Sequence, residues 1–397
     1  MLLQSLLISG IFSQMKTILI RGTIITPDQV LMHHNLIIEG EKIVGITANA
    51  PPDLAENEII DVKGFFVVPG FIDVHVHGAV GFDTMDATSG AILRMGDDFA
   101  RHGVTTFLPT TVAASAKDIH NAINNVSATP RSTTGAQHLG LHLEGPYVNH
   151  EFRGAQPPQH LRPADKNEYS TWFESKQIRL ITVAPEVDGV SDLIRDGKEA
   201  GVEFALGHTS ATYEQVMMAV ELGLHQATHT FNGMPALNHR SPGAVGAVLS
   251  DDRIWAQIIV DGVHVHPAVV KLLIKVKGVD RTIMITDAIR ATGMPNGDYA
   301  LGDQMVHVKD GVARTDAGGL AGSTLTMDQA LRNVMDFADL SLADALPMLT
   351  RVPAVSIGID DHKGFIAPGF DADIVVLDQS YQVRMTMVAG KVVYKNL

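Results

Sequence analysis

Metal-binding side chains alternate with apolar ones in the segment from Asp73 to Gly78. Successive side chains of a β-strand point to opposite faces, so Asp73, His75 and His77 share one face and the valines between them share the other. Two imidazoles two residues apart on one face form a pincer for a divalent metal ion. The alternative is that these are polar residues at a strand end with no metal, and the rest of the chain argues against it.

Groups that bind metal ions recur at the ends of four later apolar runs. They are Glu144, His208, His229 and Asp287. Nitrogen and oxygen donors of this kind suit Zn²⁺, Fe²⁺ and Mn²⁺, and the chain has no cysteine, which excludes a thiolate site. The sequence therefore predicts one metal centre assembled from several strand ends.

The other histidines are interpreted differently. His142 faces inward but lies one pleat below Glu144, so we expect it to support the site or to pack in the core. His225 lies four residues before His229, about 13 Å down the strand, and is expected to be structural. Six others are expected on the surface: His33, His34, His102, His120, His160 and His362.

The strands that carry these groups alternate with helical patterns. Strands are expected near 71–77, 104–109, 138–144, 179–183, 202–208, 225–229, 255–260 and 282–287, and helices over 89–101, 116–126, 188–200, 212–222 and 326–338. Eight strand-plus-helix units predict an α/β fold of the (β/α)8 barrel type, in which chemistry occurs at the C-terminal ends of the strands. Residues 296–317 resemble a short β excursion after the eighth strand.

Short β-type runs without helices flank this barrel on both sides. They are 17–21, 35–39, 42–46 and 59–61 before it, and 372–377, 383–388 and 391–394 after it. Runs of this kind predict a small β-sandwich built from both termini. We expect its two parts over 1–68 and 357–397, and the barrel over 69–356.

The composition limits the classes of function. The 397 residues are 45% hydrophobic and 19% charged, which fits a globular chain with a large core. This length alone suggests two to three domains, but α/β barrels commonly exceed that yardstick. The formal net charge of −14 and the lack of a basic run argue against a nucleic-acid partner. An anionic substrate would therefore need a local basic pocket, because the overall field repels it.

The apolar stretches of the chain and its first residues give expectations about its location in the cell. No stretch of 18 apolar residues occurs, so no membrane span is expected. Residues 1–14 lack both the basic start and the small-residue cleavage site of a secretory signal. We expect a cytoplasmic protein whose translation starts at Met1 or Met15, and both starts remain open.

Taken in order, the motifs of this chain resemble those of the amidohydrolase superfamily and, within it, the family of N-acetylglucosamine-6-phosphate deacetylases. The matching segments are 69–78, 142–147, 153–156, 184–186, 207–212, 228–235, 261–264, 286–288 and 319–323. They run through the whole barrel, and the terminal β-runs also match.

The resemblance implies a role for each metal-binding group. Glu144, His208 and His229 would hold the principal ion, and His75 and His77 would hold a second ion with Glu144 as the bridge. One or two divalent ions per chain are therefore expected, with Zn²⁺ or Fe²⁺ ahead of Mn²⁺ or Co²⁺. Many amidohydrolases bridge with a lysine at the end of strand four, and this chain has none there, which favours the subgroup bridged by glutamate.

The proton carrier is expected to be Asp287, which would take a proton from the attacking water and return it to the leaving amine. Two other readings of Asp287 remain open, a metal ligand and a helix cap after strand eight.

The resemblance also implies a phosphorylated N-acetylhexosamine as the substrate. The residues implied in binding it are Ala155, Asn232, Gly233, Arg240, His264, Leu320, Ala321 and Gly322. The guanidinium of Arg240 suits a phosphate group, and the resemblance implies that it completes the site of a neighbouring subunit in a homodimer. Gln156 occupies a position that is histidine in some members, so its part in phosphate binding stays open.

Three other functions remain as alternatives. A deacetylase of N-acetylgalactosamine 6-phosphate would differ only in recognising the C4 hydroxyl of the sugar. A ring-opening amidohydrolase of the dihydroorotase or hydantoinase kind is disfavoured by the missing lysine and by the position of Glu144. A non-catalytic scaffold should have lost metal ligands, and every expected ligand is present.

Overall fold

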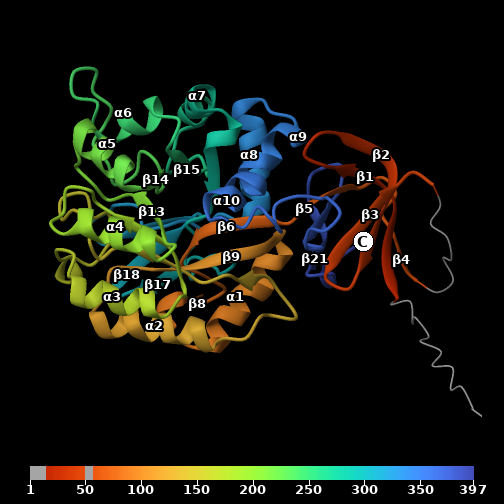
Figure 1. Ribbon diagram of the computed structural model, residues 1–397, viewed down its shortest axis with the longest axis horizontal. Coiled ribbons are helices and arrows are strands. Elements are labelled where there is room, and N and C mark those ends of the chain that lie inside the picture. Colours follow the sequence, from red (N-terminus) through yellow and green to blue (C-terminus); the bar gives the residue numbers. More distant parts are fainter. Residues whose placement is uncertain (1–14, 50–56) are drawn as a thin grey trace, which may run out of the picture.

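The computed structural model describes residues 15–49 and 57–397, which form a barrel and a smaller β-lobe beside it (Figure 1). The expectations about residues 1–14 lie outside the described residues. Within the described ranges, no helix combines the length and the apolar character needed to cross a membrane.

The barrel wall consists of eight parallel strands, each paired with its neighbours in chain order. They are β6 (Phe71–Val76), β9 (Val104–Thr111), β11 (Leu141–Glu144), β12 (Ile178–Val183), β13 (Glu203–Leu206), β14 (Leu224–Ala227), β15 (Trp255–Ile259) and β16 (Thr282–Ile285). Most of their residues are buried on both faces, as expected for strands covered by helices. The short strand β10 (Gln137–His138) also pairs with β9. The predicted (β/α)8 fold is confirmed.

Helices surround the strands, as Figure 1 shows. They are α1 (Ser89–Arg101), α2 (Ala116–Ala128), α3 (Lys166–Glu174), α4 (Val190–Glu199), α5 (Tyr213–Leu222), α6 (Gly243–Ser250), α7 (Pro267–Lys277) and α8 (Met327–Ala338), followed by the short α9 (Leu342–Ala345) and α10 (Arg351–Ser356). The helix α5 illustrates how the sequence sets their ends. Thr212 and Gln215 form a capping box at its start, and Gly223 ends it in the left-handed conformation.

The barrel closes between its first and last strands without a regular ladder. Instead, the amide of Asp287 donates to the carbonyl of His75 at 2.9 Å, and the amide of His77 donates to the carbonyl of Ala288 at 2.8 Å. The hydroxyl of Thr286 donates to Asp73 Oδ2 at 2.5 Å. Burial raises the pKa of Asp73 to about 6. Asp73 therefore closes the barrel instead of binding metal, and this closure brings Asp287 over the two histidines of β6.

The second lobe is an eight-stranded sheet to which both termini contribute. From the N-terminal part come β1 (Lys16–Ile25), β2 (Val30–Glu39), β3 (Lys42–Thr47), β4 (Glu58–Asp61) and β5 (Phe66–Pro69), and from the C-terminal part β20 (Ile374–Leu377), β21 (Val383–Val388) and β22 (Lys391–Lys395). The apolar side chains of both parts form one buried cluster. The sequence predicted a small β-sandwich built from both termini, and the structure shows a β-lobe to which both termini contribute, formed by this one eight-stranded sheet.

The strand β5, which the sequence analysis did not separate, joins the two parts of this sheet. It runs antiparallel to β20 and parallel to β1. A single residue, Gly70, connects it to β6, and a Cβ there would collide with Thr105 of the barrel. The first barrel strand is therefore held directly by the β-lobe.

The predicted β excursion is a three-stranded antiparallel sheet. It consists of β17 (Gly297–Leu301), β18 (Gln304–Lys309) and β19 (Val312–Thr315). Its apolar side chains pack with Val112 and Ile289, which follow barrel strands. The excursion thus lies at the C-terminal end of the barrel.

One of the histidines expected on the surface also links two helices. His102 caps the C-terminus of α1 and lies 2.9 Å from Asp328 of α8, with its side chain 31% exposed. Burial lowers the pKa of His102, but the bond to Asp328 outweighs it and raises the pKa above the ordinary value. This pair links the first helix of the barrel to the last.

The closure by Asp73 and Thr286 can be tested with Thr286→Val, which keeps the branched shape but removes the hydroxyl. The loss of a charge-assisted hydrogen bond to a buried carboxylate lowers the free energy of unfolding by about 1.5–3 kcal/mol. The midpoint of urea unfolding should fall accordingly. The control is Thr171→Val on α3, whose exposed hydroxyl donates to the carbonyl of Glu168 and whose loss should change little. Equal midpoints for both variants would contradict this closure.

Candidate active site

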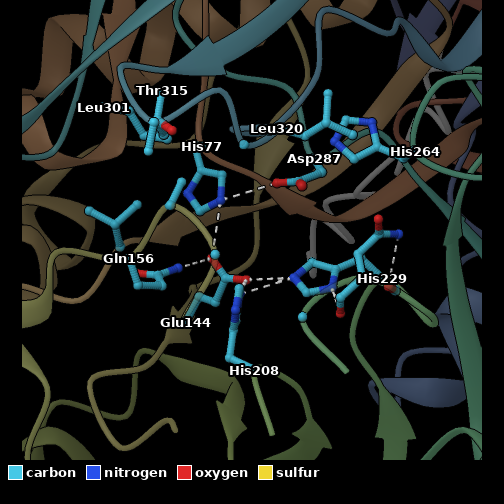
Figure 2. Close-up of a pocket in the computed structure, with 18 residues that line it drawn as sticks. His77, Glu144, Gln156, His208, His229, His264, Asp287, Leu301, Thr315 and Leu320 are labelled. Carbon is cyan, nitrogen blue, oxygen red and sulfur yellow. Dashed lines mark hydrogen bonds and ion pairs between the residues drawn. The ribbon is translucent and has the colours of Figure 1, made fainter. Parts of the chain in front are cut away.

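A cavity of about 480 Å³ opens at the C-terminal ends of the barrel strands. The metal-binding groups lie at its floor, and residues of the β17–β19 excursion form one wall (Figure 2). This is the end of the barrel where the sequence predicted the site.

The floor is organised around the carboxylate of Glu144. Its Oε1 lies 3.0 Å from Nε2 of His208 and 3.0 Å from Nε2 of His229. The same carboxylate faces the histidines of β6, with Oε1 at 3.6 Å from His75 Nε2 and Oε2 at 3.3 Å from His77 Nε2. The pair His75 and His77 and the pair His208 and His229 therefore share one carboxylate. Figure 2 shows Glu144 together with His77, His208 and His229.

Asp287 completes the arrangement from the side of the eighth strand. Its Oδ1 lies 3.2 Å from His77 Nε2 and 3.4 Å from His75 Nε2. Its backbone is fixed on both sides, because its amide donates to His75 and its carbonyl accepts from the amide of Ser323 at 2.8 Å.

Hydrogen bonds to the backbone set the tautomer of three of the four imidazoles. Nδ1 of His77 lies 3.2 Å from the carbonyl of Thr110, that of His208 3.0 Å from the carbonyl of Phe152, and that of His229 3.1 Å from the carbonyl of Asn232. A carbonyl only accepts, so each Nδ1 carries the proton and each Nε2 offers a lone pair.

Three of the residues that meet here have left-handed backbone conformations. The φ angle is 48° at His208, 30° at His229 and 51° at Asp287. Such angles in non-glycine residues cost about 1–3 kcal/mol each and cluster at functional sites. The strand ends are bent at these points so that the side chains turn over the barrel axis.

The electrostatics keep both carboxylates ionised. Burial raises the pKa of Glu144, but the surrounding imidazoles of His75, His208 and His229 outweigh it and hold the pKa well below the ordinary value. Burial also opposes ionisation of Asp287, yet His75 and His77 lower its pKa to about 2.

The donor set fits a divalent cation. The Nε2 atoms of His208 and His229 lie 3.2 Å apart, and those of His75 and His77 lie 3.3 Å apart. Lone pairs that point at one another across such distances repel, and a cation between them and the carboxylate removes the repulsion. The two candidate groups are His75, His77 and Glu144, and Glu144, His208 and His229.

Other predicted residues are brought to the same cavity. The six that line it are Ala155, Asn232, Gly233, His264, Leu320 and Gly322. His264 is oriented by Asp261, whose Oδ2 lies 2.7 Å from its Nδ1. Burial raises the pKa of Asp261, but His264 outweighs it and lowers the pKa.

Two predicted residues do not line the cavity of their own chain. Ala321 is fully buried and packs in the cluster beneath the excursion instead of facing the cavity. Arg240 is exposed in the loop after β14. Within residues 15–49 and 57–397, no lysine or arginine lines the cavity.

Gln156 also lines the cavity, but its polar ends are engaged within the protein. Its Nε2 donates to Glu144 Oε2 at 2.6 Å, and its Oε1 accepts from the amide of Ala113 at 2.7 Å. These contacts point to Glu144 and not to a phosphate group.

Sequence reasoning missed four other residues that line the cavity. They are Val112, Leu301, Thr315 and Ala317. The available signal was the position of the excursion after the eighth strand, which places it at the C-terminal end of the barrel.

Comparison with known proteins gives a consistent result. A model of the amidohydrolase family matches residues 66–393. The chain is 40% identical over 339 residues to an N-acetylglucosamine-6-phosphate deacetylase of Lysinibacillus sphaericus, which covers 84% of this chain and 87% of that protein. It is also 40% identical over 326 residues to an N-acetylgalactosamine-6-phosphate deacetylase of Escherichia coli O157:H7, covering 81% and 86%.

A solved structure is similar over almost the whole chain. It is a mutant of N-acetyl-D-glucosamine-6-phosphate deacetylase from Mycobacterium smegmatis in complex with N-acetyl-D-glucosamine-6-phosphate. The TM-score is 0.90 at 34% identity, and the match covers 96% of this chain and 100% of the other.

The metal centre can be tested through Glu144, which belongs to both candidate groups. Protein purified without chelators should contain a divalent transition metal by mass spectrometry, and Glu144→Gln should lose most of it. Asp261→Asn is the control, because Asp261 contacts His264 and neither group of metal donors. Retention of the full metal content by Glu144→Gln would exclude Glu144 as a ligand.

Proposed function

This chain belongs to the amidohydrolase family, and we propose that it hydrolyses the acetamide of N-acetylglucosamine 6-phosphate to glucosamine 6-phosphate and acetate. The observation that carries the proposal is the carboxylate of Glu144 shared by two pairs of imidazoles, with Asp287 beside it. The deacetylases similar to this chain, one of them solved with this sugar phosphate bound, supply the substrate class.

The proposed cofactor is one or two divalent cations. Glu144, His208 and His229 would hold the principal ion, and His75 and His77 would hold a second one together with Glu144. Zn²⁺ and Fe²⁺ suit imidazole and carboxylate donors best, with Mn²⁺ and Co²⁺ as alternatives. Such a cation lowers the pKa of bound water towards 7 and polarises a carbonyl group.

The proton transfers are assigned to Asp287. Its carboxylate is ionised at neutral pH, so it can accept a proton from the water whose oxygen attacks the acetamide carbon. A bond then forms between that oxygen and the carbonyl carbon, and the carbon–nitrogen bond breaks. Asp287 returns the proton to the departing amine, and the acetyl group leaves as acetic acid, which loses its proton to the solvent to give acetate.

The sugar and its phosphate need other donors. His264 is proposed to bind a sugar hydroxyl, and the backbone at Asn232 and Gly233 offers N–H groups to an anion. Because no lysine or arginine of the described residues lines the cavity, the phosphate requires a cation from elsewhere. We assign this role to Arg240 of a second copy of the chain, which makes the enzyme a homodimer. The cytoplasmic location stays a prediction from the sequence.

A second candidate substrate is N-acetylgalactosamine 6-phosphate. The relative from Escherichia coli O157:H7, named for this substrate, is as similar to the chain as the relative from Lysinibacillus sphaericus. The two sugars differ only at the C4 hydroxyl, so the ratio of kcat/KM for the two phosphates decides between them.

The proton carrier is tested with Asp287→Asn, which keeps size and polarity but cannot accept the proton. We expect kcat to fall by roughly 10²–10⁴, the usual contribution of a positioned general acid–base. Metal content should stay close to that of the wild type, because the proposed ligands come from other strands. Asp192→Asn on the exposed face of α4 is the matched control. A kcat within a few-fold of wild type would refute the assignment, and loss of metal would make Asp287 a ligand.

The substrate and Arg240 are tested together. The wild type should deacetylate N-acetylglucosamine 6-phosphate far more efficiently than the sugar without phosphate. Arg240→Ala should raise KM for the phosphorylated sugar and leave the other unchanged. The exposed Arg195→Ala on α4 is the control.

A mixture of chains shows whether Arg240 serves the neighbouring site. Arg240→Ala chains keep Asp287, and Asp287→Asn chains keep Arg240, so a mixed dimer contains one complete site. At a concentration of the sugar phosphate well below the raised KM, each variant alone should be much less active than the wild type, and mixing the two should restore activity. Without recovery after subunit exchange, Arg240 cannot act across a dimer.

A further inference from the structure

The two oxygens of Glu144 face different neighbours. Oε1 lies 3.0 Å from Nε2 of both His208 and His229, whereas Oε2 lies 3.3 Å from Nε2 of His77. Oε2 also accepts the hydrogen bond from Gln156. The side-chain amide of Gln156 is therefore bound to the oxygen that faces His77, whereas His75 lies 3.6 Å from Oε1.

Gln156 is held so that it cannot easily release this oxygen. Its side chain is buried, and its carbonyl oxygen accepts from the amide of Ala113. A backbone amide only donates, so this contact fixes which end of the Gln156 side chain is oxygen and which is nitrogen. The backbone N–H group of Gln156 donates to the carbonyl of Arg153 at 2.9 Å. The N–H group that meets Glu144 is consequently preset.

The two imidazole pairs differ in their own support. Both His208 and His229 are oriented by backbone carbonyls, and so is His77. Nδ1 of His75 has no hydrogen-bond partner among the described residues. The pair on β6 is thus oriented less completely than the other pair and depends more on how the carboxylate of Glu144 is held.

We propose that Gln156 is a positioning residue for the cation site of His75 and His77. By occupying one lone pair of Oε2, it fixes the plane of the carboxylate and leaves the second lone pair for the ion held by the β6 histidines. Oε1 remains free for the pair formed by His208 and His229. This inference rests on the proposed metal-dependent function and adds that one residue supports one of the two sites selectively.

The test measures metal binding and not only activity. Metal-free wild type and Gln156→Met, which has a similar shape but no donor, are titrated with Zn²⁺ by calorimetry. The wild type should bind two ions. In the variant, one site should weaken by about 10–100-fold, as is usual when a group that orients a ligand is lost, and the other should stay within a few-fold.

A spectroscopic measurement identifies the site that is lost. Two Mn²⁺ ions that share a carboxylate give a spin-coupled electron paramagnetic resonance spectrum, which the wild type should show at two equivalents. Gln156→Met should show uncoupled Mn²⁺ at the same loading. Gln156→Asn, which is one methylene too short to reach both partners, is a second variant and should behave like Gln156→Met.

The matched control is Gln257→Met. Gln257 is fully buried in the barrel and donates to Gln226 at 3.0 Å, away from Glu144, so both cation sites should persist. Unchanged affinities at both sites of the Gln156 variants, or equal losses at both, would overturn the inference. A wild type that binds a single ion would also overturn it. A wild type that binds none refutes the proposed function itself.

Discussion

The site depends on one shared carboxylate. Four imidazoles converge on the barrel axis, and three of them are fixed with a lone pair pointing inward. Without a cation between them, these lone pairs and the carboxylate of Glu144 would repel one another. Glu144 supplies the negative charge that such a cation needs. It is the last residue of β11, at the end of the barrel where the C-terminal ends of all the parallel strands meet. The other elements can be understood as holding donors at the right distance from this group.

Holding them there requires strained backbone that the rest of the fold must offset. His208, His229 and Asp287 all have positive φ angles, and none is a glycine. Hydrogen bonds hold the backbone in this conformation. At Asp287, for example, the backbone amide and the carbonyl both form hydrogen bonds with other segments. The large apolar core between the strands and the helices keeps these segments from relaxing.

Much of this arrangement could be predicted from the sequence because it follows a period of two. The alternation around His75 and His77 and the acidic or histidine residues at later strand ends place these groups on one rim. Ligand identity follows from residue type, so the absence of cysteine was informative. The barrel was predicted from a different pattern, the alternation of eight apolar runs with helical patterns.

The contacts that adjust the site could not be predicted, because they join residues with no regular spacing. Gln156 reaches Glu144 from a loop, and Thr286 reaches Asp73 across the closure. The burial of Ala321 depends on how the excursion packs, which a motif does not show. The contact of His102 with Asp328 could not be predicted because the two residues lie far apart along the sequence.

The single residue between β5 and β6 has a consequence for how the protein is made and for how it can be divided. The strand β5 pairs with β20 on one side and with β1 on the other, and β20 lies near the far end of the chain. During synthesis, the first barrel strand emerges long before the segment that anchors its neighbour. The anchoring of His75 and His77 is thus completed only when the last strands leave the ribosome. The barrel is consequently not expected to fold correctly without the β-lobe. A truncated or circularly permuted chain must keep β5 and β20 together.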